Sequence, residues 1–312
     1  MPNTTLIFSH YGYSTYLEYS LACARKTNPH ARLVFLGDEH NHNVAVRAGW
    51  EHFLFNDFRS HHQSRFGDVF RHVQGKNHNP IKNGKDWLRY VFERWFFIDG
   101  FVSAQSIDRF WHFDSDTMVM QNLNCFEQQL GVFDFTVQCN NTCLNGLVKR
   151  VVVSEYCEWI CKLFENDDFL TTQQKEFDTA HPDWAFTEMR AFDSYQSDTT
   201  RPRLHLLHYA DDQVFDDCIC QEHGFQMCAL PSGEIVKQLI SMDGKVYGYR
   251  DSRVVEFVTL NLSWVPDYVF SWVMTCLDGG GRAGIEQAQC SFHQTMRGLV
   301  RKMRRLVKNA TS

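Results

Sequence analysis

The sequence lacks the features that define several protein classes. No apolar run reaches the roughly 18 residues that a membrane-spanning helix needs, and the first residues lack the basic start and apolar stretch of a signal peptide. The net charge is −6, which argues against binding nucleic acid through its phosphates. The 11 cysteines form no CxxC pair, so we expect mostly reduced, partly buried thiols rather than a disulfide framework.

Two common catalytic and nucleotide-binding motifs are also missing: G-x-x-x-x-G-K-[ST] and G-x-S-x-G. What the chain has is a globular composition, with 312 residues, 44% hydrophobic and 22% charged. Aromatic residues make up 14%, which favours a phenylalanine-rich core or pockets lined by rings. We expect one two-part domain, because no linker or internal repeat divides the chain.

Apolar strand-like segments alternate with helical ones in the first part of the chain. The expected strands are 4–12, 31–39, 51–57 and 110–113, and the expected helices are 14–29, with Ser14 as N-cap, and 86–105. Residues 59–84 are polar and predict a long loop with some helix. This order predicts an α/β fold with a parallel sheet and helices on both faces.

The second part of the chain is less regular. Residues 131–150 predict a strand followed by a turn, and 151–166 predict a helix. A short helix is expected over 183–195, with Asp183 as its N-cap. Residues 245–264 predict antiparallel strands.

Two aspartates, Asp114 and Asp116, follow the buried strand at 110–113. In an open parallel sheet, ligands bind at the carboxyl ends of the strands. If the segment is extended, both carboxylates point to one side and Ser115 to the other. Such a pair suits Mg²⁺ or Mn²⁺ bridging a diphosphate. The plain alternative is a solvated turn, and we favour the metal because of the buried segments that precede the pair.

The stretches "LIFSHYGYSTYLEYSLACARKTNPHARLVFLGDEHN", "FERWFFIDGF" and "FWHFDSDTMVM" together resemble the DxD glycosyltransferases of the GT-A fold, of the bacterial, algal and viral kind. The resemblance implies a Rossmann-like mixed sheet with a smaller antiparallel acceptor-side portion. It also implies transfer of a hexosyl or pentosyl group from a UDP- or GDP-linked sugar to an acceptor hydroxyl. On this reading 1–123 is the nucleotide-binding half, 124–285 the acceptor-side half, and 286–312 a basic C-terminal helix.

The resemblance also assigns expected roles to residues. Asp116 is expected to be the main metal ligand, with Asp114 contacting ribose or the metal through water. Asn261 stands where relatives have a metal-binding histidine, and His205, His208 or water are alternatives to it. The remaining donor-binding residues are expected to be Ser9, His10, Tyr11, Asp38, Ser115, Asn145 and Gly146.

The catalytic carboxylate is expected in the segment that resembles the "sDM" element of the family. Glu188 is the first choice for taking the acceptor proton if the enzyme inverts, followed by Asp183 and Asp193. If the enzyme retains configuration, Glu188 is expected to position the donor sugar. The sequence leaves both outcomes open.

The sequence also leaves two other functions open. A metal-dependent nucleotidyltransferase would need a further carboxylate, and an inactive carbohydrate- or nucleotide-binding protein would agree with the loss of the histidine at Asn261. The acceptor is expected to be a glycan, glycolipid or protein.

Segment 292–309 is cationic and amphipathic, so it either rests on an anionic membrane or packs on the body. We predict a cytoplasmic protein that does not bind nucleic acid.

Overall fold

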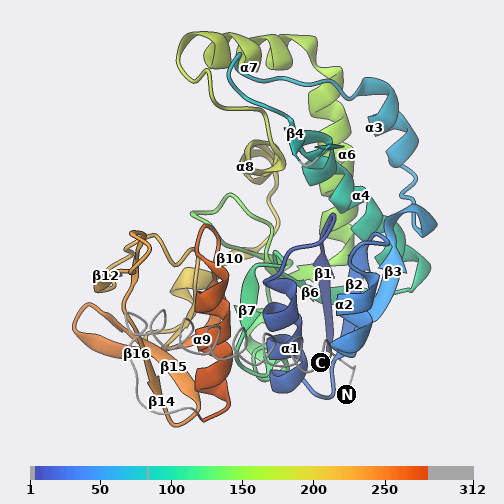
Figure 1. The fold of residues 1–312 in the computed structure, drawn as a ribbon. Helices are drawn as coiled ribbons and strands as arrows, with labels where there is room; N and C mark the ends of the chain where they lie inside the picture. The colour runs from blue at the N-terminus through green and yellow to red at the C-terminus, as the bar shows by residue number, and fades with distance from the viewer. Residues whose placement is uncertain (1–3, 83, 280–312) are drawn as a thin grey trace, which may run out of the picture.

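The structure is a computed structural model that describes residues 4–82 and 84–279 (Figure 1). A seven-stranded sheet forms its centre, in the order β10-β8-β9-β6-β1-β2-β3. The strands are β1 (Thr5–Ser9), β2 (Arg32–Gly37), β3 (Glu51–Leu54), β6 (Arg109–His112), β8 (Phe135–Val137), β9 (Gly146–Lys149) and β10 (Arg203–His205). The strands β3, β2, β1 and β6 run parallel, whereas β9 is antiparallel to both β6 and β8.

Helices cover both faces of this sheet, as the sequence predicts. Ile7 of β1 belongs to a core built with α4 (Trp87–Ala104) and α6 (Arg150–Glu165). Its neighbours Leu6 and Phe8 face the opposite side and pack with α1 (Leu17–Thr27) and α2 (His42–Arg47). Successive strand residues point to opposite faces, so a strand buried on both sides is apolar throughout.

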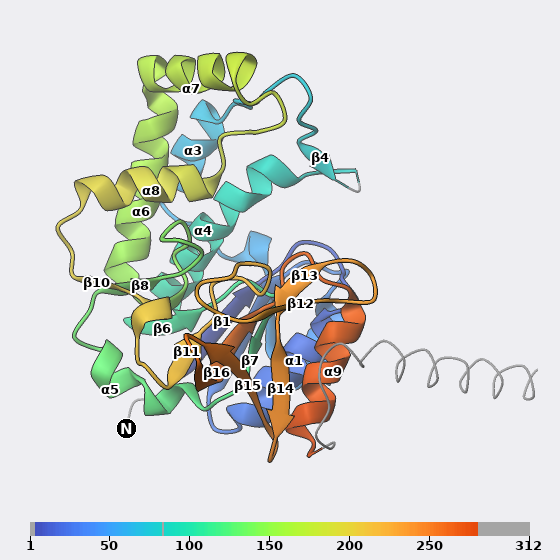
Figure 2. The same ribbon diagram turned by 90° about the vertical axis from the view of Figure 1, so that its left-hand side faces the viewer.

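A second, smaller sheet is built mainly from the later part of the chain. Its strands are β7 (Thr117–Val119), β11 (Gln213–Phe215), β14 (Leu239–Met242), β15 (Lys245–Arg250) and β16 (Arg253–Asn261). Strands β14, β15 and β16 are antiparallel, as predicted for 245–264, and β7 pairs with β16. Helix α9 (Asp267–Leu277) packs on this sheet (Figure 2). The strand that follows the two aspartates therefore joins the two sheets.

The helices α3 (Gln63–Val69), α6, α7 (Asp167–Thr179) and α8 (Glu188–Asp198) gather above the central sheet (Figure 1). The sequence did not predict α7, which begins after Asn166, whose side chain accepts a hydrogen bond from Phe169 N. The remaining elements are α5 (Glu127–Leu130), the hairpins β4 (Ile81–Lys82) with β5 (Lys85–Asp86) and β12 (Met227–Ala229) with β13 (Ile235–Lys237), and three single turns at Phe55–Asp57, Leu123–Cys125 and Leu206–His208.

Two predicted helix starts are wrong. Helix α8 begins at Glu188 and not at Asp183, because the residues before Thr187 are held by other contacts, including the bond from Phe186 N to Val73 O. Helix α1 begins at Leu17, and Ser14 does not cap it. The Ser14 hydroxyl instead lies 3.2 Å from Nε2 of His10. A side-chain partner outside the helix thus replaces the expected cap.

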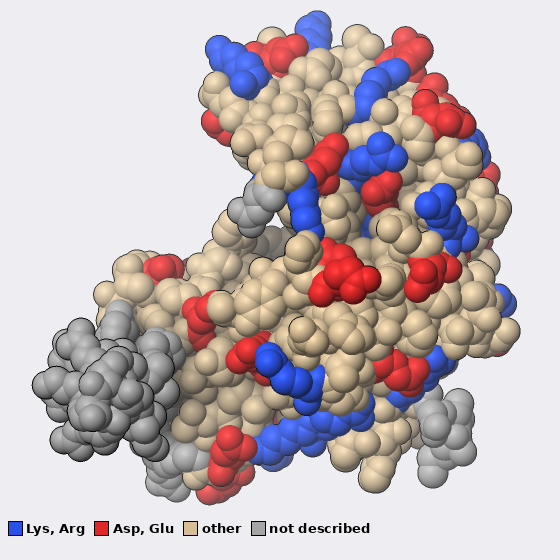
Figure 3. Space-filling model, turned by 45° about the vertical axis from the view of Figure 1, so that its right-hand side comes forward, with Lys and Arg blue, Asp and Glu red and all other residues tan. Residues whose placement is uncertain are grey.

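Charges of both signs are mixed on the face shown in Figure 3, which carries no extended basic patch. Within the described residues, no helix is long and apolar enough to cross a bilayer. The predicted basic helix in 286–312 lies outside the described part of the chain, so both readings of the tail remain predictions.

Candidate active site

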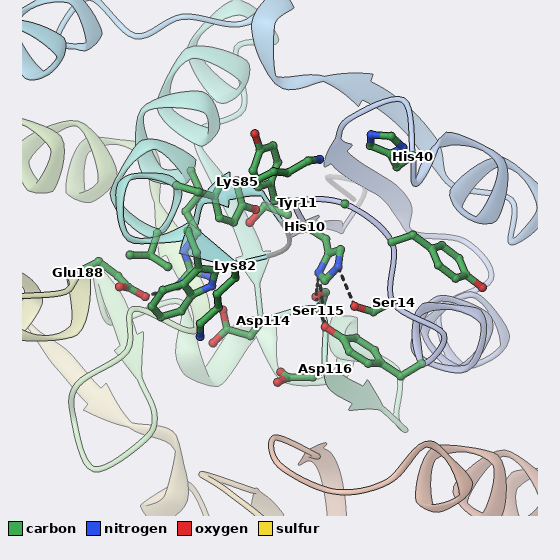
Figure 4. A pocket seen from close by; sticks show the side chains of 18 of the residues that line it. His10, Tyr11, Ser14, His40, Lys82, Lys85, Asp114, Ser115, Asp116 and Glu188 are labelled. Carbon is green, nitrogen blue, oxygen red and sulfur yellow. Dashed lines mark hydrogen bonds and ion pairs between the residues drawn. The ribbon is translucent and has the colours of Figure 1, made fainter. Parts of the chain in front are cut away.

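A pocket of about 610 Å³ lies at the carboxyl ends of β1 and β6. Its lining combines carboxylates, cations and aromatic rings, which come from the ends of these strands, the β4–β5 hairpin, α4 and the start of α8 (Figure 4). The charged lining residues are Lys82, Lys85, Arg94, Asp114, Asp116 and Glu188. The predicted location of the site at the end of a buried strand therefore agrees with the position of this cavity.

The segment that carries the two aspartates is a turn and not an extended strand. Thr117 N donates a hydrogen bond to the carbonyl of Asp114 over 2.9 Å, which closes the chain around Ser115 and Asp116. The predicted alternation is therefore wrong, and Ser115 lines the pocket together with both aspartates (Figure 4). The turn places three consecutive polar side chains at one edge of the cavity.

Asp114 is ion-paired with Arg94, a residue of α4 that the sequence analysis missed. Arg94 Nη1 lies 2.6 Å from Asp114 Oδ1, and its Nη2 lies 3.0 Å from Glu188 Oε1. One guanidinium therefore joins the D-x-D turn to the first residue of α8. A signal for it existed, since Arg94 stands inside the aromatic-rich stretch "FERWFFIDGF", and a cation in a buried helix needs carboxylate partners.

Asp116 has different surroundings, although it is only two residues away. Ser263 Oγ donates a hydrogen bond to its Oδ2 over 2.8 Å, whereas its Oδ1 is buried and has no hydrogen-bond partner. Burial, and then the charge of Asp114, raise the pKa of Asp116 to about 6. A buried carboxylate oxygen without a partner is costly, and a bound cation would satisfy it.

The other two carboxylates respond to the same guanidinium. Burial raises the pKa of Glu188 to about 7, although Arg94 opposes this shift. For Asp114 burial also acts upward, but Arg94, with smaller contributions from His112 and Asn145, holds the pKa of this carboxyl below its ordinary value. Asp114 is thus the permanent anion of the site, and Glu188 is the carboxyl that can exchange a proton near neutral pH.

The residues predicted to hold the donor nucleotide form the wall next to Ser115. His10 Nδ1 and Ser115 Oγ are hydrogen-bonded over 2.8 Å, and burial lowers the pKa of His10 to about 4, so the imidazole is neutral. Tyr11 stacks on Tyr90 of α4 with ring centroids 4.8 Å apart. Ser9 also lines the pocket. The first-strand turn is therefore brought to the aspartates, as the resemblance implies.

Asp38 is next to this wall, in a smaller cavity of about 300 Å³ that shares Tyr11 and Tyr90. Its Oδ2 accepts hydrogen bonds from Gly12 N over 2.7 Å and from Lys85 Nζ over 3.1 Å. Burial opposes these bonds, but together they hold the pKa of Asp38 below its ordinary value. In this structure Asp38 fixes the first-strand turn.

Three predicted residues lie behind the pocket wall. Asn145 is buried, and its Nδ2 donates to Asp114 Oδ2 over 3.4 Å. Gly146 has φ +98°, and a Cβ there would lie 2.1 Å from Thr136 Oγ1, so only glycine fits. Asn261 ends β16, and its Oδ1 accepts from Ser263 N over 3.1 Å. None of the three lines the main pocket.

The two reserve candidates for the catalytic base are not brought to the site. Asp183 and Asp193 are exposed, and neither lines the pocket. His205, an alternative metal ligand, contacts Asp217 Oδ2 over 2.8 Å instead. Of the three predicted catalytic carboxylates, only Glu188 borders the cavity.

The donor set suits one divalent cation held mainly by Asp116. Its partnerless carboxylate oxygen is a hard ligand of the type that Mn²⁺ and Mg²⁺ prefer. Asp114 is engaged by Arg94 and the Asn261 amide oxygen by Ser263. Within the part of the chain that the structure describes, no three His, Cys, Asp or Glu side chains gather as a metal site. A cation here would take its other ligands from water and substrate.

No protein-family model matches the chain, and no curated protein matches it in sequence. Among solved structures, the glycosyltransferase GlyE of Streptococcus pneumoniae TIGR4 is 14% identical with a TM-score of 0.33, over 65% of this chain and 45% of GlyE. The galactosyltransferase LgtC, solved with donor and acceptor sugar analogues, is 10% identical with a TM-score of 0.38, over 67% and 76%.

A cytidylyltransferase from Leptospira borgpetersenii is 10% identical with a TM-score of 0.31, over 63% of this chain and 94% of that one. The match to GlyE spans less than half of that protein's length. Identities and TM-scores this low assign no function to this chain.

Proposed function

We propose that the protein is a metal-dependent glycosyltransferase that moves a sugar from a nucleotide-diphosphate sugar to an acceptor hydroxyl. One observation carries the proposal: a buried carboxylate oxygen of Asp116 has no partner, and its residue lines a large pocket at the carboxyl ends of parallel strands. This edge of an open α/β sheet is where nucleotides bind. The DxD resemblance of the same residues supports the proposal.

The donor nucleotide is assigned to the wall formed by Ser9, His10 and Tyr11. The rings of Tyr11 and Tyr90 offer an aromatic surface for a base, and Tyr11 is partly exposed. Ser115, which bonds to neutral His10, lies between this wall and the two aspartates and offers a hydroxyl to the ribose or phosphates. These positions order the donor from its base to its diphosphate.

The metal is assigned to Asp116, where, when bound, it would neutralise charge on the departing diphosphate. Asp114 cannot turn freely to a cation, because Arg94 holds one of its oxygens. We therefore assign Asp114 and Arg94 to orientation of the donor sugar and diphosphate. Any contact of Asp114 with the metal would therefore be the indirect one that the sequence predicts, through water.

Among the carboxylates of the pocket, Glu188 best fits the role of a general base. Its pKa of about 7 allows it to accept a proton near neutral pH, and it shares Arg94 with Asp114. We assign it the acceptor proton in an inverting reaction and the positioning of the donor sugar in a retaining one. The acceptor hydroxyl would belong to a glycan, glycolipid or protein.

The nucleotidyltransferase alternative has less support. A two-metal site needs a further carboxylate directed at the metals, and in residues 4–82 and 84–279 the third pocket carboxylate, Glu188, is turned to Arg94. The inactive alternative predicts nucleotide binding without turnover.

The test is calorimetric titration of the full chain with UDP, GDP and their sugars, with and without Mn²⁺, together with an assay for sugar release. Metal-dependent binding of one nucleotide and slow metal-dependent hydrolysis of its sugar conjugate are expected. Binding without hydrolysis or transfer to any acceptor would favour the inactive binder. Binding and hydrolysis that do not depend on a metal would contradict the proposal.

A further inference from the structure

The charged side chains of the pocket divide into those with an ionic partner and those without one. Arg94 bridges Asp114 and Glu188, and Lys85 pairs with Asp38 over 3.1 Å. No carboxylate among the described residues lies within 4.0 Å of the ammonium of Lys82. Lys82 is therefore the pocket cation that the protein itself leaves without a counter-charge.

The β4–β5 hairpin carries Lys82 opposite a second lysine. Lys82 and Lys85 are directly opposite each other in the hairpin, and like charges at such positions repel. Lys85 is engaged by Asp38 and lies over the ring of Tyr11, 4.1 Å from its centroid. An anion bound near Lys82 would relieve the repulsion that remains.

The position of Lys82 is fixed by Trp87, the first residue of α4. Lys82 Nζ lies 3.7 Å from the centroid of a Trp87 ring, and both residues line the pocket. In Figure 4, Lys82 extends to the side of the cavity that carries Asp114 and Glu188, whereas Lys85 lies beside Tyr11. A cation–π contact holds the ammonium without neutralising it.

We propose that Lys82 binds a phosphate group of the nucleoside diphosphate. The inference rests on the proposed function and extends it, because it assigns a second source of positive charge to the diphosphate, independent of the metal at Asp116. A lysine ammonium binds phosphate as a compact point charge and with charge-assisted hydrogen bonds. The alternative, a solvated lysine that merely rests on Trp87, predicts no effect on substrate affinity.

The test compares Lys82→Met with Lys175→Met, which removes the same charge from the exposed face of α7, outside the pocket. Both variants and the wild type are titrated by calorimetry with UDP, GDP, uridine, guanosine and inorganic pyrophosphate in the presence of Mn²⁺. Lys82→Met is expected to weaken binding of the preferred nucleoside diphosphate and of pyrophosphate roughly tenfold or more, and to leave binding of the nucleoside unchanged. Lys82→Arg should retain most of the affinity.

The possible results separate this inference from the function on which it rests. Equal diphosphate affinity in Lys82→Met and the wild type would overturn the role of Lys82 and leave the proposed function standing. An equal loss for nucleoside and diphosphate would also overturn it, because Lys82 would then act on the base or on folding. If the wild type bound none of the nucleoside diphosphates and no pyrophosphate, the proposed function itself would fail.

Discussion

This protein has two pairs of aspartates, each pair close in sequence, whose surroundings differ. The pocket pair, Asp114 and Asp116, borders a cavity of about 610 Å³. The closed pair, Asp216 and Asp217, has side chains that are 0% exposed, and Asp216 is joined to Lys237, which is equally buried. Buried charge is common to both pairs, so burial alone does not define a functional site.

Each pair also has one buried carboxylate oxygen without a partner, Oδ1 of Asp116 and Oδ1 of Asp217. What distinguishes the pocket pair is that Asp116 lines a space that a ligand can enter, whereas Asp217 does not line this pocket. In the closed pair, Asp216 Oδ1 is matched by the Lys237 ammonium and its Oδ2 by the backbone N–H of Asn261. The end of β16 connects the two pairs, since Ser263, two residues after Asn261, donates to Asp116. The closed pair therefore holds in place the segment on which Asp116 depends.

The largest stability effect is expected from breaking the closed pair. Lys237→Met would leave the Asp216 carboxylate buried without its cation, and loss of one partner of a buried pair lowers the free energy of unfolding by about 3–5 kcal/mol. Urea unfolding measures this change. Lys245→Met, which breaks the pair between the exposed Lys245 ammonium and Glu256, is the control and should lose about 1 kcal/mol or less. Equal losses in the two variants would contradict the contrast between the pairs.

A smaller, pH-dependent effect is expected in the pocket. Burial raises the pKa of Glu188 from 4.5 to about 7, so the folded state binds this proton more tightly than the unfolded state. The resulting stabilisation is present below pH 4.5 and is lost as the pH rises to about 7. Urea unfolding at several pH values in this range should show that the free energy of unfolding of the wild type, minus that of Glu188→Gln, falls as the pH rises. If this difference stays constant or grows with pH, the raised pKa does not belong to Glu188.

The smallest effect is expected at the segment that links the two pairs. Trp264 has φ +69° and is 85% exposed, so its strained backbone is not offset by burial of the ring. Trp264→Gly should raise the free energy of unfolding by about 0.5–1 kcal/mol, because glycine adopts positive φ without strain. Thermal unfolding measures the shift. Trp184→Gly is the control, because it removes another exposed indole at a position without positive φ. This variant should not stabilise the protein. If both variants stabilise it, backbone strain at Trp264 is not the cause.

Much of the fold could be predicted because local patterns and burial agree. The apolar strands Thr5–Ser9 and Arg32–Gly37 and the aromatic helix Trp87–Ala104 lie where the sequence indicates. Helix Asp167–Thr179 was missed, because its buried residues are few: only Leu170 and Phe177. Local rules also misplaced the start of the helix near Glu188, which long-range contacts determine.

The site was predictable where chemistry follows from residue type and position in the sequence. The two aspartates and the first-strand turn line one pocket. The residues that give the two aspartates different roles, however, lie far from them in sequence. Arg94 is 20 residues from Asp114 and Ser263 is 147 residues from Asp116. Contacts over such separations depend on the fold, and no sequence spacing indicates them.

The most direct measurement is titration of Mn²⁺ followed by its electron paramagnetic resonance signal, with UDP or GDP present, in the wild type, Asp116→Asn and Asp217→Asn. Adding the wild type should lower the free Mn²⁺ signal further than the nucleotide alone lowers it. Asp217→Asn, which makes the same change in the closed pair, should behave as the wild type if it folds by circular dichroism, whereas Asp116→Asn should show no such additional fall. Undiminished Mn²⁺ binding by folded Asp116→Asn would contradict a metal site at the pocket pair.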